Sequence, residues 1–296
     1  MLPGLMRKNS LLTVFLTAAI IYHCNAQNNN KKWSPTIAVN FTSIPVSHGS
    51  DTTYNNALVV DPNISYRSNG GFGVTYSPYF VLGGSQPGIF MHKVDVGLEQ
   101  YGKPKFDIVA EYTHYFFTGN SSIPLTPITN QILFSGTYKK SLIRPVISAG
   151  LGFGKDTGTS SGSTAIEIAF AAGINHPFTF NFNNYKLTFT PSVLLDGGTN
   201  EYFSFLNISK YITHSKNFKN VISAAKAKGR SRGQTNNKNA TDVAPIELSN
   251  LELNLEGSLD IGSFNIRPVG SLFIPFQTAY WKNLDGYWEI TLSYYF

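Results

Sequence analysis

The last nine residues of the chain, from Trp288 to Phe296, alternate strictly between two kinds of side chain. One face of this segment carries Trp288, Ile290, Leu292, Tyr294 and Phe296, and the other carries Glu289, Thr291, Ser293 and Tyr295. Alternation with a period of two predicts a β-strand. A strand that meets hydrocarbon on one face and water on the other favours this pattern, with an aromatic ring at the membrane interface. The end of the chain therefore predicts a membrane-spanning strand.

This ending resembles the closing strand of the outer-membrane β-barrel proteins of Gram-negative bacteria. In that class, a terminal phenylalanine after alternating apolar residues is read by the barrel assembly machinery. The resemblance implies an all-β fold, a transmembrane antiparallel up-and-down barrel of the small porin-like class. It also implies that outer-membrane lipid, lipopolysaccharide and the assembly machinery are partners. The assembly signal would consist of Trp288, Ile290, Leu292, Tyr294 and Phe296. A secreted soluble β-sandwich also alternates and is the competing fold.

The amino terminus has the features of an export signal. Arg7 and Lys8 precede an apolar run from Leu11 to Tyr22, and small or tolerated residues lead up to Ala26. The run is shorter than the roughly 20 apolar residues that span a bilayer. We therefore expect residues 1–26 to be a cleaved secretory signal peptide and residues 27–296 to form one barrel domain.

The single cysteine, Cys24, raises a rival interpretation as a lipoprotein acylation site. Lipoprotein signals carry a small residue directly before the cysteine, whereas this chain has His23, so the ordinary signal peptide is favoured. Loss of Cys24 with the signal would leave a mature chain without disulfides or thiol chemistry. No other stretch approaches 18 consecutive apolar residues, so any membrane span of the mature chain must be a barrel.

Alternating stretches predict twelve strands along the mature chain. They run over residues 36–46, 58–66, 71–81, 89–99, 105–117, 131–139, 142–154, 164–180, 186–195, 248–259, 264–274 and 287–296. Short turn-like links alternate with longer polar links without a break, as expected when periplasmic turns are short and extracellular loops are long. The second stretch contains Asp61 and Pro62, and proline removes a ladder donor, so ten strands is the alternative count.

One segment holds most of the positive charge. The formal net charge of the whole chain is +6, but eight Lys and Arg residues lie between Tyr202 and Thr241 with no acid among them. Without these eight and without Arg7 and Lys8, the remainder carries a net charge of −4. We expect an extracellular loop at about 197–246, disordered over 207–240, because its composition offers little apolar surface to bury. Contact with anionic lipopolysaccharide or polysaccharide, or plain solvation, is favoured over nucleic-acid binding.

Charged residues within the predicted strands fall on the face opposite the apolar one, which would be the inside of the barrel. These candidates are Lys93, Asp95, Glu99, Asp107, Glu111, Arg144, Glu167, Lys186, Glu252, Glu256, Arg267 and Glu289. They predict either a cation-preferring lumen or small polar-ligand site, or a charge network that fills and stiffens a narrow barrel. A catalytic pair of carboxylates is a third interpretation, for which the sequence offers no substrate pocket.

Two hairpins predict particular cross-strand neighbours. A turn at 260–263 would bring Leu259 opposite Phe264 and Glu256 opposite Arg267, as an ion pair. A turn at 101–104 would bring like charges together, unless cations reach between them. These pairs would be Asp95 with Glu111 and Glu99 with Asp107, and the candidate cations are Lys93 and Arg144.

The remaining motifs favour no cofactor, metal or catalytic site. His48 and Ser50 have the spacing of the pair in outer-membrane phospholipases and deacylases, but Gly49 and Asp51 do not reproduce the neighbours, so a loop is favoured. The histidines have no metal-ligand spacing; they are His92, His114, His176 and His214. The glycines of 150–154 lie inside a predicted strand, which excludes a nucleotide loop and indicates small inward residues.

These observations favour a porin-like channel for ions or small polar solutes. A non-conducting barrel that presents surface loops for adhesion or interaction is the alternative, and a lipid-modifying hydrolase comes third. The sequence leaves the oligomeric state open.

Overall fold

A computed structural model describes residues 33–44, 57–82, 87–101, 103–118, 127–155, 164–199, 246–276 and 285–296. This part of the chain is all-β and contains thirteen strands. They are β1 (Trp33–Ile44), β2 (Ala57–Ser68), β3 (Phe72–Leu82), β4 (Gly88–Gln100), β5 (Phe106–Phe117), β6 (Ile128–Tyr138), β7 (Arg144–Lys155), β8 (Thr164–Asn175), β9 (Phe178–Asn181), β10 (Lys186–Gly198), β11 (Glu247–Ile261), β12 (Phe264–Pro275) and β13 (Asp285–Tyr295). Among the described residues, no helix is long and apolar enough to cross a membrane.

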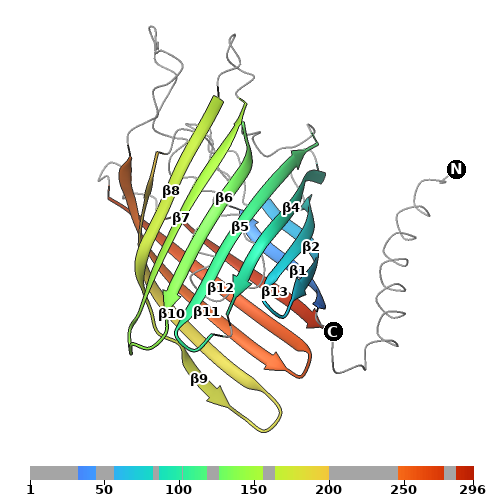
Figure 1. The fold of residues 1–296 in the computed structure, drawn as a ribbon, viewed down its shortest axis with the longest axis vertical. Coiled ribbons are helices and arrows are strands. Elements are labelled where there is room, and N and C mark those ends of the chain that lie inside the picture. The colour runs from blue at the N-terminus through green and yellow to red at the C-terminus, as the bar shows by residue number, and fades with distance from the viewer. Residues whose placement is uncertain are drawn as a thin grey trace, which may run out of the picture.

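Antiparallel pairing joins these strands into a closed barrel (Figure 1). From β1 to β8 and from β10 to β13, each strand pairs with its sequence neighbours around the wall, and β13 pairs with β1. Pairing of β10 with both β8 and β11 completes the ring, so twelve strands form the barrel and β9 is an additional piece. The prediction of a twelve-stranded antiparallel barrel is confirmed.

The strand predicted over 164–180 is interrupted. His176 and Pro177 separate β8 from β9, because Pro177 has no N–H to donate to the ladder. The His176 amide still donates to the Pro191 carbonyl at 3.2 Å, so β9 continues along the same partner strand, β10. The resulting hairpin extends beyond the other short links of the barrel (Figure 1).

The second strand is present despite its proline. Pro62 lies within β2, and the register of β2 with β3 places it opposite Pro78, in a stretch where no ladder pairs form. Because both residues lack an N–H, matching them at one place disturbs the ladder once rather than twice. The alternative of ten strands is therefore wrong.

Short and long links occupy opposite ends of the barrel. The short links join β2 to β3, β4 to β5, β6 to β7, β9 to β10 and β11 to β12, and we call this the short-link end. Trp33 pairs with Ser68, and Thr36 pairs with Tyr295, so β1 begins and β13 finishes at this same end. The alternation of link lengths read from the sequence is thus a property of the fold.

The wall is apolar outside and polar inside. In β13, Trp288, Ile290 and Leu292 are 47%, 39% and 44% exposed, whereas Glu289 and Thr291 between them are fully buried. The same alternation runs through β3 and β5. A soluble sandwich would bury its apolar faces instead. The distribution is that of a transmembrane barrel and excludes the sandwich.

Aromatic rings cluster on the outer surface at the short-link end. The contacts, given as centroid separations, are Trp33 with Tyr66 at 5.3 Å, Phe106 with Tyr138 at 5.1 Å, and Tyr294 with both Phe264 and Phe296 at 4.8 Å. Rings of this kind belong at the boundary between hydrocarbon and water. The terminal Phe296 is therefore part of an interfacial aromatic band.

The turn between β11 and β12 is tighter than predicted. Both strands run to a two-residue link, with Ile261 paired to Phe264 and Gly262 at φ +57°. Only glycine adopts that left-handed conformation at little cost. The register therefore differs by two residues from the prediction, and Glu256 lies opposite Val269 rather than Arg267. The predicted direct pairing of Glu256 with Arg267 is wrong.

Candidate functional site

Most of the predicted charged residues line the inside of the barrel. Ten of the twelve are at most 5% exposed, namely Lys93, Asp95, Glu99, Asp107, Glu111, Glu167, Glu252, Glu256, Arg267 and Glu289. Arg144 is half-buried at the start of β7, and Lys186 is exposed on the hairpin that β9 makes with β10. We call the inward-facing side chains of the described strands the inner wall.

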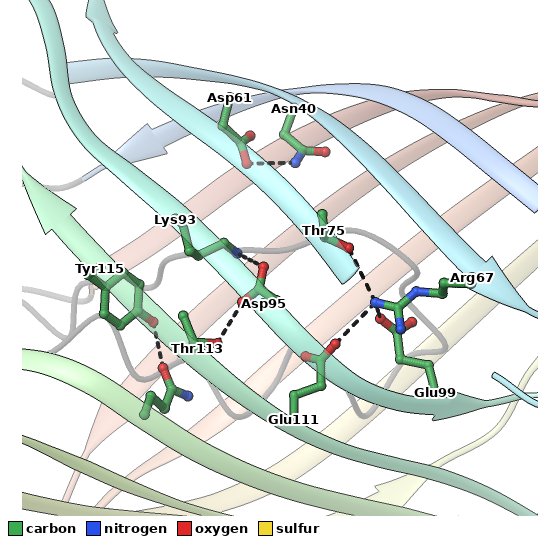
Figure 2. Close-up of polar contacts among 11 residues, drawn as sticks. Asn40, Asp61, Arg67, Thr75, Lys93, Asp95, Glu99, Glu111, Thr113 and Tyr115 are labelled. Carbon is green, nitrogen blue, oxygen red and sulfur yellow. Dashed lines mark hydrogen bonds and ion pairs between the residues drawn. The ribbon is translucent and has the colours of Figure 1, made fainter. Parts of the chain in front are cut away.

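Arg67 organises a cluster near the short-link end (Figure 2). Its guanidinium forms ion pairs with Glu99 and, at 3.2 Å, with Glu111. It also donates to the Thr75 hydroxyl and to the Gly71 carbonyl, each at 3.4 Å. The side chains of Glu99 and Glu111 are 2% and 0% exposed, so their charges depend on this arginine for compensation.

A second cluster lies further along the same side of the barrel. Lys93 Nζ lies 3.3 Å from the Asp95 carboxylate and 5.6 Å from the centre of the Tyr79 ring. Thr113 on the neighbouring strand β5 donates to Asp95 at 2.6 Å. Tyr115 donates to Gln131 at 2.6 Å on the next strand (Figure 2). The wall from β3 to β6 is thus a connected polar surface.

A third cation closes the turn between β4 and β5. Lys139 Nζ contacts the Asp107 carboxylate at 2.9 Å and the Tyr101 carbonyl at 3.0 Å. Tyr101 lies in the short link itself, and burial, with a further contribution from Glu99, raises the pKa of its phenol well above the ordinary value. The phenol therefore stays neutral and keeps its proton beside these acids.

The seam between the first and last strands is joined by side chains as well as by the ladder. Asn40 donates to Asp61 at 3.0 Å and accepts from Thr291 at 2.8 Å. Thr42 donates to Glu289 at 3.1 Å. Asn40 and Glu289 are both fully buried, so β1 is linked to β2 on one side and to β13 on the other through the inner wall.

The like-charge pairs expected across β4 and β5 do not form directly. Asp95 lies opposite Thr113, Glu99 lies opposite Val109, and Glu111 lies opposite Gly97. The link between the strands is longer than a four-residue turn, which moves the register by two residues and makes the acids diagonal neighbours. The compensating cations are Lys93, as predicted, and Arg67 and Lys139 in place of Arg144.

Sequence reasoning missed three members of this wall. Asp61 was treated together with Pro62 as an interruption of the second strand, and Arg67 was assigned to a link. Lys139 was the last residue of the strand predicted over 131–139 but was not counted among the inward charges. All three continue the inward period of their strands, since Asp61, Asn63, Ser65 and Arg67 alternate with outward residues in β2. Following the alternation through the proline, past the assumed end of the second strand and to the last residue of the stretch 131–139 would have found them.

The inner wall carries an excess of negative charge. Among the described side chains that are buried, nine are carboxylates and only Lys93 and Arg267 are cations. Three half-buried cations and two half-buried acids, which are Arg67, Lys139, Arg144, Asp196 and Asp260, do not restore the balance. Such a wall attracts cations and disfavours anions.

The glycines at 150 and 152 face inward, as predicted. Both are buried within β7, while Leu151 between them is 39% exposed on the outer surface. Small residues at these positions leave room inside the wall.

Other predicted residues lie outside this wall or outside the described residues. His92 contacts the Tyr76 hydroxyl at 2.8 Å and His114 contacts Asn130 at 2.7 Å, both on the outer surface. Within the described ranges, no group of His, Cys, Asp and Glu side chains is arranged to hold a metal ion. The proposed signal peptide, the pair at 48 and 50, His214 and the basic segment 207–240 lie outside the described residues.

Comparisons with known proteins gave structural neighbours only. No model of a known family matches the chain, and no curated protein was found to be similar. Among solved structures, a NanC porin is similar over 87% of this chain and 98% of the porin, with 8% identity and a TM-score of 0.43. OccAB1 of Acinetobacter baumannii is similar over 82% of this chain and 65% of its own, with 10% identity and a TM-score of 0.26. The unliganded ferric citrate transporter FecA is similar over 84% of this chain and 39% of its own, with 10% identity and a TM-score of 0.22. The barrel fold is established by the strand pairing of this chain itself.

Proposed function

We propose that this protein is a non-enzymatic outer-membrane barrel that conducts ions or small polar solutes and prefers cations. Two features support a location in the membrane. The outer surface consists of exposed apolar side chains, and an aromatic band lies at the short-link end. Arg or Lys facing lipid near the bilayer midplane costs about 2–4 kcal/mol, and the strand charges of this barrel avoid that face. The predicted signal peptide and the alternating aromatic-rich segment 288–296 support export and assembly in the outer membrane.

The excess of buried carboxylates on the inner wall is the observation that carries the cation preference. Nine acids against two cations produce a negative potential along the lumen, and low-dielectric walls focus such a field. Rings and rows of Asp and Glu are the usual basis of cation selectivity in pores. The clusters around Arg67 and Lys93 cancel only part of this charge.

Reversal potentials in a planar bilayer test this proposal. The refolded mature protein, in a gradient of KCl, should give single-channel steps with a reversal potential on the cation-selective side. Glu252→Gln on the inner wall should reduce the preference, whereas Glu247→Gln, at an exposed position of the same strand, should leave it unchanged. Anion-selective steps would contradict the charge argument.

A gel-shift experiment tests the barrel and its location. A closed barrel satisfies its backbone hydrogen bonds internally and resists cold detergent. Unboiled and boiled samples of an outer-membrane fraction should therefore migrate differently. Recovery in the soluble periplasm, with identical migration of both samples, would remove the membrane assignment.

A non-conducting scaffold for surface interactions is the second candidate, and one observation favours it. The inner-wall side chains are shielded from solvent, with Lys93 and Asp95 at 2% and 1% exposure. A network of paired charges can fill a barrel and stiffen it. Absence of steps from a barrel that passes the gel test would select this function over the channel.

A further inference from the structure

We infer that the inner wall between β10 and β11 holds a binding site for a primary ammonium group, formed by Ser192, Asn254 and Glu256. This inference rests on the proposed cation preference of the lumen and deepens it by naming the chemical class of cation. The three residues are buried, at 4% to 5% exposure. Each of them presents a buried oxygen that has no hydrogen-bond partner among the described residues.

Strand register places these residues next to one another. Ser192 of β10 lies directly opposite Asn254 of β11, and Thr190 lies directly opposite Glu256. Side chains that face each other across an antiparallel ladder have Cβ atoms about 4.5–5.5 Å apart. Asn254 and Glu256 are successive inward positions of one strand, so Glu256 is the next residue along the same face of the wall.

The hydrogen bonds of Asn254 fix the direction of its free oxygen. Its amide nitrogen donates to Glu252 at 3.3 Å and to the Ser271 hydroxyl at 2.7 Å. The Glu252 carboxylate can only accept, so the nitrogen must be on that side. The amide oxygen therefore points away from Glu252 and β12, and the strand on the other side of β11 is β10, which carries Ser192.

The three neighbouring oxygens match a primary ammonium group. Such a group has three N–H donors and no acceptor, so it can satisfy Ser192 Oγ, Asn254 Oδ1 and Glu256 Oε2 together. Glu256 supplies the opposite charge, and charge-assisted hydrogen bonds are the strong ones. A buried acceptor without a donor destabilises the protein, so a ligand that donates to all three oxygens removes three such penalties together.

The composition of the site separates an ammonium group from its rivals. A calcium site takes 6–8 oxygen ligands, whereas this site offers one carboxylate and two neutral oxygens. A quaternary ammonium ion has the charge but no N–H, and it is recognised by aromatic faces rather than by oxygens. The number of N–H donors on the cation therefore distinguishes a primary ammonium group from a quaternary one at this site.

Saturable protection from unfolding tests the inference. The refolded mature protein in detergent should show a rise in its urea midpoint with ethylammonium chloride that saturates. Tetramethylammonium chloride and KCl at the same concentration should give no saturable rise. Equal effects of ethylammonium and tetramethylammonium would overturn the inference, since charge alone would then explain the result.

Matched variants locate the site. Glu256→Gln should weaken the apparent affinity for ethylammonium at least tenfold, and Ser192→Ala should weaken it about threefold or more. The controls are Glu167→Gln and Ser148→Ala, which change equally buried residues elsewhere on the inner wall and should stay within twofold. If Glu256→Gln does not fold, Ser192→Ala against Ser148→Ala decides the question alone.

The outcome is separable from that of the proposed function, because protection in detergent needs no conduction. Cation-selective steps without specific ethylammonium protection would overturn the site and leave the channel. Specific protection in a barrel that gives no steps would keep the site and remove the channel. Equal losses in the Ser192 variant and its Ser148 control would also overturn the assignment of residues.

Discussion

Replacing Arg67 with methionine should destabilise the barrel, because it leaves two buried carboxylates without their cation. Methionine keeps much of the apolar stem of the arginine and removes only the charge and the donors. The Glu99 and Glu111 side chains are 2% and 0% exposed, and both form ion pairs with Arg67. The change therefore isolates the electrostatic contribution of one residue.

The expected cost follows from this burial. Removing one partner of a buried pair typically costs about 3–5 kcal/mol. The Arg67 side chain is itself 17% exposed, so water partly screens the pair and we expect the lower end, about 3 kcal/mol. With urea slopes of about 1–3 kcal/mol per molar, the unfolding midpoint should fall by roughly 1–3 M.

Urea unfolding of the refolded protein, followed by tryptophan fluorescence, measures this change. Lys105→Met is the control, because Lys105 is exposed in the link after β4 and its loss should stay within about 0.5 kcal/mol. Adding Glu99→Gln and Glu111→Gln to the Arg67 variant should restore most of the stability. A loss below about 1 kcal/mol, or a triple variant less stable than Arg67→Met, would refute the buried-pair argument.

Three further outcomes are expected. Phe296→Ala should lower the amount of barrel assembled in cells while protein refolded in detergent still shifts on an unboiled gel, because the alternation of the strands persists without this ring. Unchanged cellular assembly would count against the assembly signal. Gly173→Val should lower the free energy of unfolding in urea by about 1–3 kcal/mol, because an added Cβ would clash with the Val193 carbonyl. Gly270→Ala should leave that free energy unchanged, because the space around Gly270 is open. Trypsin added to intact cells should cut first within 207–240, where eight cations lie in the sequence; cleavage only after permeabilisation would mean that the long-link end faces the periplasm.

The faces of the strands could be predicted from the sequence more reliably than their partners. Side chains alternate with a period of two, so a register error of two residues leaves every residue on its own face. Glu256 and Arg267 illustrate this, because both are buried inside as expected although Val269 is the residue opposite Glu256. The residue opposite Glu256 depended on whether the turn between β11 and β12 held two residues or four. Gly262 adopts the left-handed conformation that the two-residue turn requires.

The residues missed were those at strand ends and beside prolines. Arg67 lies next to the last residue of β2 and Lys139 lies just beyond β6, where composition resembles a link. The side chains of Arg67 and Lys139 point inward because the pleat of each strand continues and because acids on neighbouring strands attract them. The sequence alone does not show which strands are neighbours or which acids lie close. The break at Pro177 was missed for the opposite reason, because apolar alternation continues through Phe178 and Phe180.

The seam between β1 and β13 also constrains the order of folding. Thr36 pairs with Tyr295, and the hydrogen bonds of Thr42 and Asn40 reach across 247 and 251 residues of chain. Contacts of such long range form late, because the loop they close carries its full entropy until the intervening hairpins are in place. Until then the sheet has two unpaired edges, each able to pair with another chain. The buried polar side chains of this seam therefore act on the final step, in which an open sheet that could aggregate becomes a ring with no edge.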